Sequence, residues 1–183
     1  MRLTKIYTRT GDEGKTRLAN GDQVMKNSLR VQAYGDVDEL NSILGLVRCE
    51  NPTPKVDSLL LQIQHHLFDL GGELASAGAI TGLILDEHVT SIEKAIDGLN
   101  QDLSPLEEFI LPGGTKTASH LHHARTVCRR AERSMITLTE TDALSTPLIP
   151  YINRLSDLLF VMARFENQQG GNQEVYWKNP RRS

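Results

Sequence analysis

Cysteine, aromatic side chains and net positive charge are all scarce in this sequence. The two cysteines, Cys49 and Cys128, offer neither a disulfide framework nor the spacing of a zinc site, so we expect reduced thiols in a cytoplasmic protein. The net charge of −3 argues against a nucleic-acid-binding protein, whose binding face is usually basic. No apolar run reaches transmembrane length, and the first residues lack the apolar core of a signal peptide. We therefore expect neither membrane nor nucleic acid among the partners.

The length of the chain predicts a single domain over residues 1–183, with room for a sizeable core. Five segments place apolar side chains at helical spacing and are separated by turn residues, which predicts an all-α fold. Asp36 and Glu39 are spaced as in a capping box, so the first helix is expected to begin at Asp36. The predicted helices span 36–49, 56–77, 86–101, 116–139 and 147–168.

The first 27 residues are polar and glycine-rich, without a sustained period. Gly14-Lys15-Thr16 is similar to the end of a nucleotide-binding P-loop, but Arg9 stands where that motif requires its first glycine. We expect a flexible segment over 1–27 whose backbone amides and lysine wrap phosphates, with a disordered arm of no function as the alternative. The tail over 170–183 is expected to be peripheral, with Trp177 as its candidate docking residue.

The fourth predicted helix has four charged side chains on one side. At about 100° per residue, Arg125, Arg129, Glu132 and Arg133 fall within an arc of roughly 100°, whereas Arg130 points elsewhere. We call these four residues the charged arc. A solvated helix face is the ordinary interpretation of such a pattern. The alternative is an anion-binding wall, in which guanidinium groups match phosphate oxygens.

An apolar loop precedes this helix. Phe109, Ile110 and Leu111 stand directly before the turn residues Pro112, Gly113 and Gly114. Such a loop either plugs the end of a helical bundle or lines an apolar ligand site, and the sequence leaves both open.

Histidines cluster at the start of the same helix. His120, His122 and His123 lack the spacing and the nearby carboxylate of a zinc site. No Ser-His-Asp arrangement stands out either, so the sequence indicates neither a structural metal nor a nucleophilic triad.

Five blocks of the sequence closely resemble one family, the ATP:cob(I)alamin adenosyltransferases of the propanediol-utilisation type. The resemblance implies an up-and-down bundle of five helices, ferritin-like in architecture, assembled as a homotrimer with active sites between neighbouring subunits. In the order of the family, the blocks are residues 7–14, 30–42, 109–114, 121–133 and 153–160.

The resemblance also implies a reaction. The 5′-deoxyadenosyl group of ATP is transferred to cob(I)alamin, which gives adenosylcobalamin and inorganic triphosphate. The reduced cobalt is the nucleophile, so the protein needs none; Mg²⁺ is expected mainly on the ATP phosphates, with Glu132 as a possible ligand. A reductase for cob(II)alamin and a B12-dependent acceptor enzyme are the implied partners. One alternative is a carrier that binds ATP or adenosylcobalamin and delivers the cofactor; another is a purely structural helical trimer.

Individual roles follow from the resemblance as well. Arg129 is expected to be catalytic, Asp38 to pair with Arg125 across the subunit boundary, and Phe109 to occupy the lower face of the corrinoid and keep it four-coordinate. The residues expected to bind ATP are Thr8, Arg9, Thr10, Gly11, Gly14, Lys15, Thr16, Lys26, Arg129, Arg130, Glu132, Arg133 and Asn153.

Overall fold

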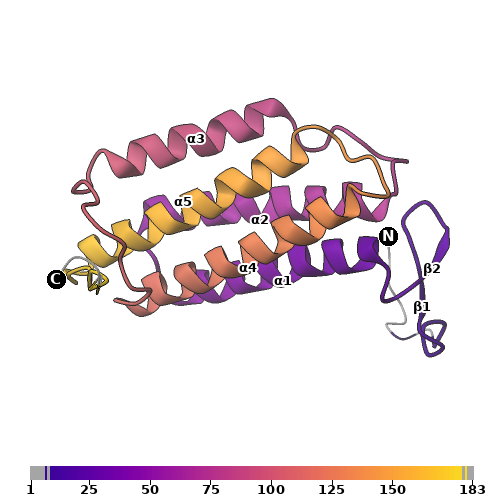
Figure 1. Ribbon diagram of the computed structural model, residues 1–183, viewed down its shortest axis with the longest axis horizontal. Helices are drawn as coiled ribbons and strands as arrows, with labels where there is room; N and C mark the ends of the chain where they lie inside the picture. Colours follow the sequence, from indigo (N-terminus) through magenta and orange to yellow (C-terminus); the bar gives the residue numbers. More distant parts are fainter. Residues whose placement is uncertain (1–6, 8, 179, 181–183) are drawn as a thin grey trace.

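The computed structural model describes residues 7, 9–178 and 180 of the chain, and it is an all-α bundle, as predicted. Its helices run side by side, with α4 packed against both α1 and α5, α2 against α1, and α3 against α5 (Figure 1). None of the helices in this part of the chain is long and apolar enough to cross a membrane. The five helices are α1 Leu29–Cys49, α2 Pro54–Ala75, α3 Asp86–Asn100, α4 Lys116–Leu138 and α5 Leu148–Gln169.

The bundle core is made of the apolar stripes that the sequence places at helical spacing. Leu44, Leu60, Leu121 and Leu155 come from four different helices, and each is fully buried. Burying a leucine side chain stabilises a fold by about 1.5–3 kcal/mol, so these stripes dominate the folding energy. The largest buried side chain, Tyr151, keeps its hydroxyl 3.1 Å from Nδ1 of a histidine on α2, because a buried polar group needs a partner.

The predicted start of the first helix is wrong. α1 begins at Leu29, seven residues before Asp36, whereas the other four helices begin and end within two residues of their predicted bounds. Asp36 does not cap a helix end; its carboxylate accepts hydrogen bonds from Ser134 Oγ at 2.5 Å and from Arg130 Nε at 3.3 Å. The spacing typical of a capping box arises here because α1 presents its acidic side chains to α4.

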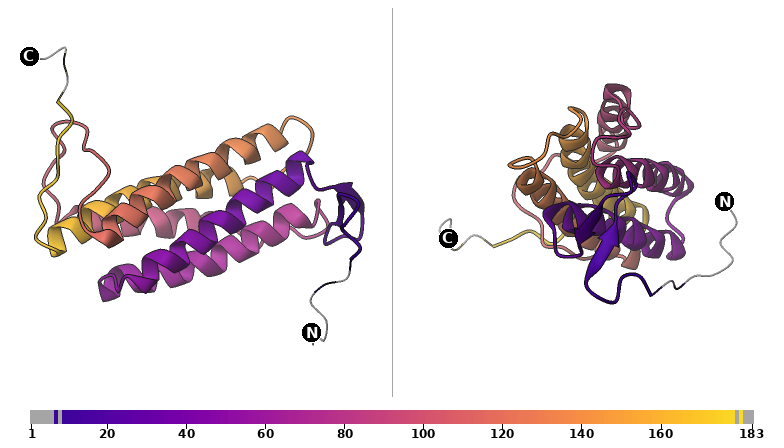
Figure 2. Two further views of the ribbon diagram at one scale, coloured as in Figure 1. Left: turned by 90° about the horizontal axis from the view of Figure 1, so that it is seen from below. Right: turned by 90° about the vertical axis from the view of Figure 1, so that its right-hand side faces the viewer.

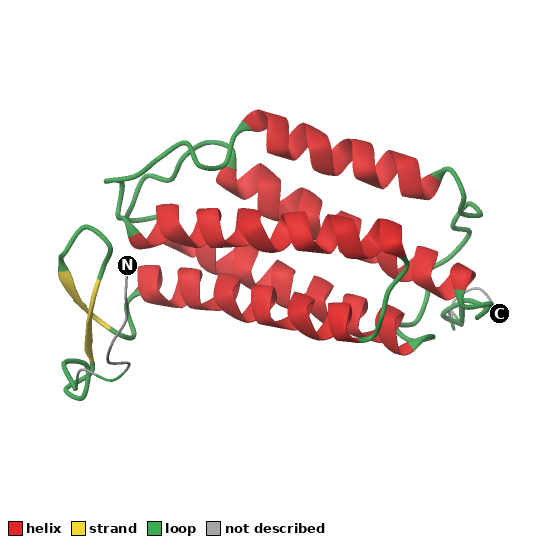
Figure 3. Ribbon diagram, turned by 180° about the vertical axis from the view of Figure 1, so that it is seen from behind, coloured by secondary structure: helices red, strands yellow, loops and turns green. Residues whose placement is uncertain are grey.

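The N-terminal segment contains a small β-hairpin that the sequence did not predict. β1 (Lys15–Arg17) and β2 (Gln23–Met25) pair antiparallel beyond one end of the bundle (Figures 1 and 3). Strands of three residues are too short to produce a detectable alternation of apolar and polar side chains. The hairpin turn is attached to the bundle, because Ala19 N donates to Ala75 O at 2.8 Å.

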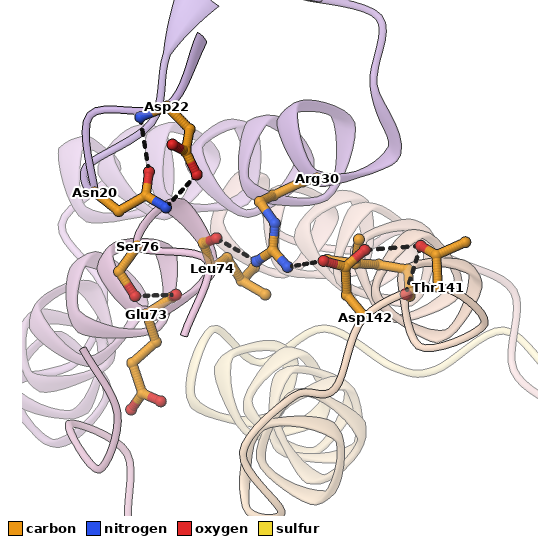
Figure 4. A network of polar contacts seen from close by, with 9 residues as sticks. Asn20, Asp22, Arg30, Glu73, Leu74, Ser76, Thr141 and Asp142 are labelled. Carbon is orange, nitrogen blue, oxygen red and sulfur yellow. Dashed lines mark hydrogen bonds and ion pairs between the residues drawn. The ribbon is translucent and has the colours of Figure 1, made fainter. Parts of the chain in front are cut away.

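A polar network holds the helix ends together beside this hairpin. Arg30 Nη1 donates to Leu74 O at 2.7 Å, and Nη2 donates to Asp142 Oδ1 at 2.5 Å, so the start of α1 is tied to the end of α2 and to the α4–α5 connection (Figure 4). The buried Glu73 carboxylate accepts from two backbone amides of the α2–α3 connection and from Ser145 Oγ. These hydrogen bonds fix the helix ends to which the N-terminal segment is attached.

The apolar loop and the C-terminal tail lie together at the opposite end of the bundle (Figure 2). Trp177 N donates to Phe109 O at 2.7 Å, and Leu111 N donates to Val175 O at 2.8 Å. The ring of Trp177 meets that of Phe109 edge-on, with centroids 6.4 Å apart. The tail is peripheral to the core, and Trp177 docks on the loop.

Candidate active site

The charged arc extends from the middle of α4 toward its C-terminal end. α4 runs from the end of the bundle with the apolar loop to the end with the hairpin (Figure 1). Arg125 therefore comes before Arg133 in that direction, and the eight-residue step between them corresponds to about 12 Å at 1.5 Å per residue. Arg129 and Arg133 are exposed, whereas Arg125 is half-buried. Burial, and then the positive charge of Arg129, lowers the pKa of Arg125. The arginines of α4 are thus exposed to solvent at positions 129 and 133 and partly desolvated at position 125.

Two predicted ATP-binding residues from different helices are brought together. Asn153 Nδ2 on α5 donates to Glu132 Oε1 on α4 at 2.7 Å. Asn153 Oδ1 accepts from Arg154 Nη1 at 2.8 Å, and Arg154 in turn pairs with Glu93 on α3 at 3.1 Å. These bonds fix the amide orientation, so a polar group of α5 is added to the charged arc.

Arg130 stands apart from the charged arc, in agreement with the helical geometry. Its guanidinium pairs with Asp36 and Glu39 on α1, and the hydrogen bond with Glu39 raises the pKa of Arg130. In this structure Arg130 joins α4 to α1, whereas the other predicted ATP-binding arginines of α4 are free of carboxylate partners among the described residues.

The hairpin segment encloses a cationic cavity of about 750 Å³. Lys26 lies across Gly11, and its Nζ is 2.9 Å from where a Cβ at Gly11 would stand, so a larger residue at this position would displace the lysine head group. Gly14 closes the turn, since its N–H donates to Gly11 O and its carbonyl accepts from the Lys26 amide. Thr8 lies outside the described residues. The cavity is lined by Arg9, Thr10, Gly11, Asp12, Glu13, Lys15, Thr16, Arg17, Gln23 and Lys26.

A second cavity, of about 480 Å³, opens between the apolar loop and the start of the charged arc. Phe109 and Ile110 line it from the loop, Arg125 from α4 and Phe160 from α5. The Arg125 guanidinium lies 6.0 Å from the centroid of the Phe160 ring. Phe109 is 75% exposed, so its side chain does not plug the bundle, and the ligand-site interpretation of the loop remains.

Asp38 lies in a different place. It lines a groove of about 330 Å³ between α1 and α2, beside Asn41 and the exposed ring of Phe68. The described residues of one chain therefore do not bring Asp38 to Arg125, and the predicted pair requires a second subunit.

Two further residues belong to this region: Phe160, which lines the second cavity, and His122, which lies behind the Phe160 ring. Phe160 appeared only within a block of resemblance, and His122 was weighed only as a metal ligand. His122 is 3% exposed, lies 6.0 Å from the Phe160 ring, and neither ring nitrogen has a partner among the described residues. Its position three residues before Arg125 was the signal, because that spacing places both on one side of α4. No group of three or more metal-ligating side chains occurs in the described part of the chain.

Comparison with known proteins identifies the family. The model of the family described as cobalamin adenosyltransferase matches residues 6–166. The chain belongs to this family. It is 50% identical over 183 residues to the cobalamin adenosyltransferase of Cupriavidus metallidurans, covering 100% of this chain and 98% of that one. It is 44% identical over 179 residues to the corrinoid adenosyltransferase of Bacillus subtilis, covering 95% and 92%. The resemblance predicted from the sequence blocks is confirmed.

Solved structures of cobalamin adenosyltransferases have the same fold. A variant of the PduO-type ATP:corrinoid adenosyltransferase from Lactobacillus reuteri, complexed with cobalamin and ATP, matches with a TM-score of 0.91 at 36% identity, covering 96% of this chain and all (100%) of that chain. Another variant of that enzyme, complexed with ATP, matches with a TM-score of 0.89 at 37% identity, covering 94% and 100%. The predicted five-helix architecture of the family is confirmed.

Proposed function

We propose that this chain is an ATP:corrinoid adenosyltransferase that transfers the 5′-deoxyadenosyl group of ATP to cob(I)alamin. The cobalt supplies the electron pair of the new cobalt–carbon bond to C5′, the bond from C5′ to the triphosphate oxygen breaks, and triphosphate leaves with that electron pair. The observation that best supports this function, beyond family membership, is the charged arc of α4. It leads from the exposed Arg129 and Arg133 to Arg125, which lines the second cavity together with apolar side chains.

The cations are proposed to act on the leaving group. Arg129 and Arg133, together with Lys15 and Lys26 of the hairpin segment, stabilise the charge that develops on the triphosphate. The hydrogen bond between Asn153 and Glu132 keeps both groups oriented toward the nucleotide. Mg²⁺ is proposed to bind mainly through the ATP phosphates and to neutralise part of their charge. No side chain is needed as a nucleophile, so positioning and electrostatics account for the protein's part in the reaction.

The second cavity is proposed to receive the corrinoid. Phe109, exposed at its mouth, covers the lower face of the corrinoid and excludes water and the lower base from cobalt. A cob(II)alamin without a lower ligand is easier to reduce, so this contact prepares the nucleophile. Arg125 and Phe160 form the facing wall.

The proposed assembly is a homotrimer with the site between subunits. Asp38 is exposed in one chain, and Arg125 has a buried Nε without a partner among the described residues. A buried N–H donor without a partner is costly, and the carboxylate of a neighbouring subunit would accept its hydrogen bond. The exposed Phe68 ring beside Asp38 supports the same contact. A cob(II)alamin reductase and a B12-dependent acceptor enzyme are the further partners we propose, in the cytoplasm.

The test is incubation with ATP, Mg²⁺ and chemically reduced cobalamin, followed through the corrinoid spectrum and by assay of released triphosphate. We expect adenosylcobalamin and triphosphate in equal amounts, over several turnovers per site. A single turnover with retained product would favour the carrier alternative instead. No ATP binding at equilibrium would leave only the structural alternative.

A further inference from the structure

Two buried polar side chains at the end of α5 bond to the α3–α4 connection, which contains the apolar loop. Asn167 bonds to Gly113 and Thr115 at the end of that loop, and Arg164 bonds to Ser104 before it and to Glu174 of the tail. Arg164 and Asn167 are 4% and 3% exposed and lie three residues apart, on one side of the last turns of the helix. We propose that Arg164 and Asn167 are positioning residues that set where Phe109 stands in the corrinoid cavity. The inference rests on the proposed function.

Asn167 holds the end of the loop. Its Oδ1 accepts from Thr115 N at 2.9 Å, and its Nδ2 donates to Gly113 O at 3.0 Å. The amide occupies the space that a Cβ at Gly114 would need, and Gly114 has a φ of +105°, so both the space and the backbone angle require glycine. The Asn167 carbonyl also accepts from Asn172 N at 2.9 Å, which directs the tail back toward the loop.

Arg164 joins the first part of the α3–α4 connection to the tail. Its Nη2 donates to Ser104 O at 2.8 Å, just before the loop. Its Nε and Nη2 also donate to the two carboxylate oxygens of Glu174 at 2.6 and 3.1 Å. A bidentate arginine–carboxylate pair in a buried position is directional, so one guanidinium fixes the spacing between the two segments.

The tail then pairs with the loop at Phe109 itself. Ile110 and Tyr176 form an antiparallel bridge, and the Phe109 carbonyl accepts from Trp177 N at 2.7 Å. The Phe109 backbone is therefore fixed, whereas its ring stays exposed and available to a ligand. Without these anchors, corrinoid binding alone would have to order the connection that carries Phe109, and the conformational entropy lost would weaken binding.

The test compares Asn167→Ala with Gln168→Ala as the matched control. Gln168 is the next amide on α5, but its Nε2 donates to Asp102 O, outside the loop. For Asn167→Ala we expect kcat/KM for the corrinoid to fall by about tenfold or more, because small displacements of positioning groups have effects of this size. KM for ATP should stay within about twofold of wild type. The spectrum of cob(II)alamin bound to the enzyme in the presence of ATP should lose its four-coordinate signature. The control should match wild type in all three.

A second variant guards against misfolding of the first. Trp177→Ala removes a partly exposed ring and no buried polar group, so it should fold as wild type and shift the cob(II)alamin spectrum in the same direction. If Asn167→Ala folds and keeps wild-type corrinoid kinetics and spectrum, the positioning role is wrong. If Asn167→Ala does not fold, Trp177→Ala decides by the same criterion. A wild-type protein that makes no adenosylcobalamin would refute the proposed function, which is a separate result.

Discussion

Asn153 on α5 and Glu132 on α4 are joined by a hydrogen bond of 2.7 Å, so a residue of a second helix extends the charged arc of α4. The sequence could place Glu132 on the arc by helical geometry, but it could not place Asn153 beside it. A group held in this way keeps its orientation before the substrate arrives, which lowers the entropic cost of binding.

Replacing Arg129 with alanine should nearly abolish turnover without unfolding the protein. Arg129 is exposed at the middle of the charged arc, so its loss should change the free energy of unfolding by no more than about 0.5 kcal/mol. Loss of a charge-stabilising contact in the transition state costs on the order of 10²–10³ in kcat. Lys116→Ala, which removes an exposed cation at the start of α4, is the control. Wild-type kcat in Arg129→Ala would contradict the assignment.

The proposed Asp38–Arg125 pair predicts strong coupling between distant residues of one chain. Breaking a pair buried at a subunit boundary should cost roughly 3–5 kcal/mol, because the remaining charge is left without a partner. A double-mutant cycle with Asp38→Asn and Arg125→Ala, read through trimer stability and activity, measures the coupling. Additive effects would rule the pair out, since the groove of Asp38 and the cavity of Arg125 are separate within a chain.

The N-terminal segment should become more ordered when ATP binds. Most of residues 9–17 line the cationic cavity, and none of their side chains is buried, so ligand contacts should supply much of their order. Amide hydrogen exchange at Thr10, Gly11 and Lys15 should slow on addition of ATP and Mg²⁺. Exchange in α3, away from this cavity, serves as the internal control. Unchanged exchange in the segment would mean that it does not close over the nucleotide.

Phe109→Ala should impair the reduction of bound cob(II)alamin while leaving the stability of the fold nearly unchanged. Because the ring is 75% exposed, the free energy of unfolding should change by no more than about 0.5 kcal/mol, well below the roughly 3–5 kcal/mol of a buried aromatic. ATP should bind normally, whereas formation of cob(I)alamin from bound cob(II)alamin should fail. Supplying free, pre-reduced cob(I)alamin should restore part of the rate. Leu111→Ala, a neighbouring exposed apolar residue whose side chain lies outside the cavity lining, is the control.

His122 should make the fold sensitive to mild acid. Burial, followed by the charge of Arg125, lowers the pKa of His122 from 6.5 to about 4. The unfolded chain therefore binds a proton at higher pH than the folded one, and stability is lost as the pH falls from about 6.5 toward 4. The urea midpoint of the wild type should fall between about pH 7 and pH 5 by more than that of His122→Gln. If the urea midpoint falls equally in the two proteins, the imidazole of His122 is not held neutral.

The sequence by itself determined the parts of this protein that depend on local spacing. Apolar residues at helical intervals predicted five helices, and four of them begin and end within two residues of the expected bounds. The angular position of side chains on a helix is set by 3.6 residues per turn, so the members of the charged arc, and the place of Arg130 outside it, followed from residue numbers alone. Five blocks of residues in a fixed order predicted the family, and that prediction is confirmed.

Only the tertiary structure decided the features that depend on distant partners. Asp36 lies inside α1, where its carboxylate accepts from Ser134 of α4, and the hairpin turn is held by a backbone hydrogen bond to Ala75 at the end of α2. The end of the apolar loop bonds to Asn167, more than 50 residues away, through contacts that no local pattern encodes. Long-range hydrogen bonds form only after the helices have packed, because the packing brings their donors and acceptors within reach; a linear sequence contains the partners but not their proximity.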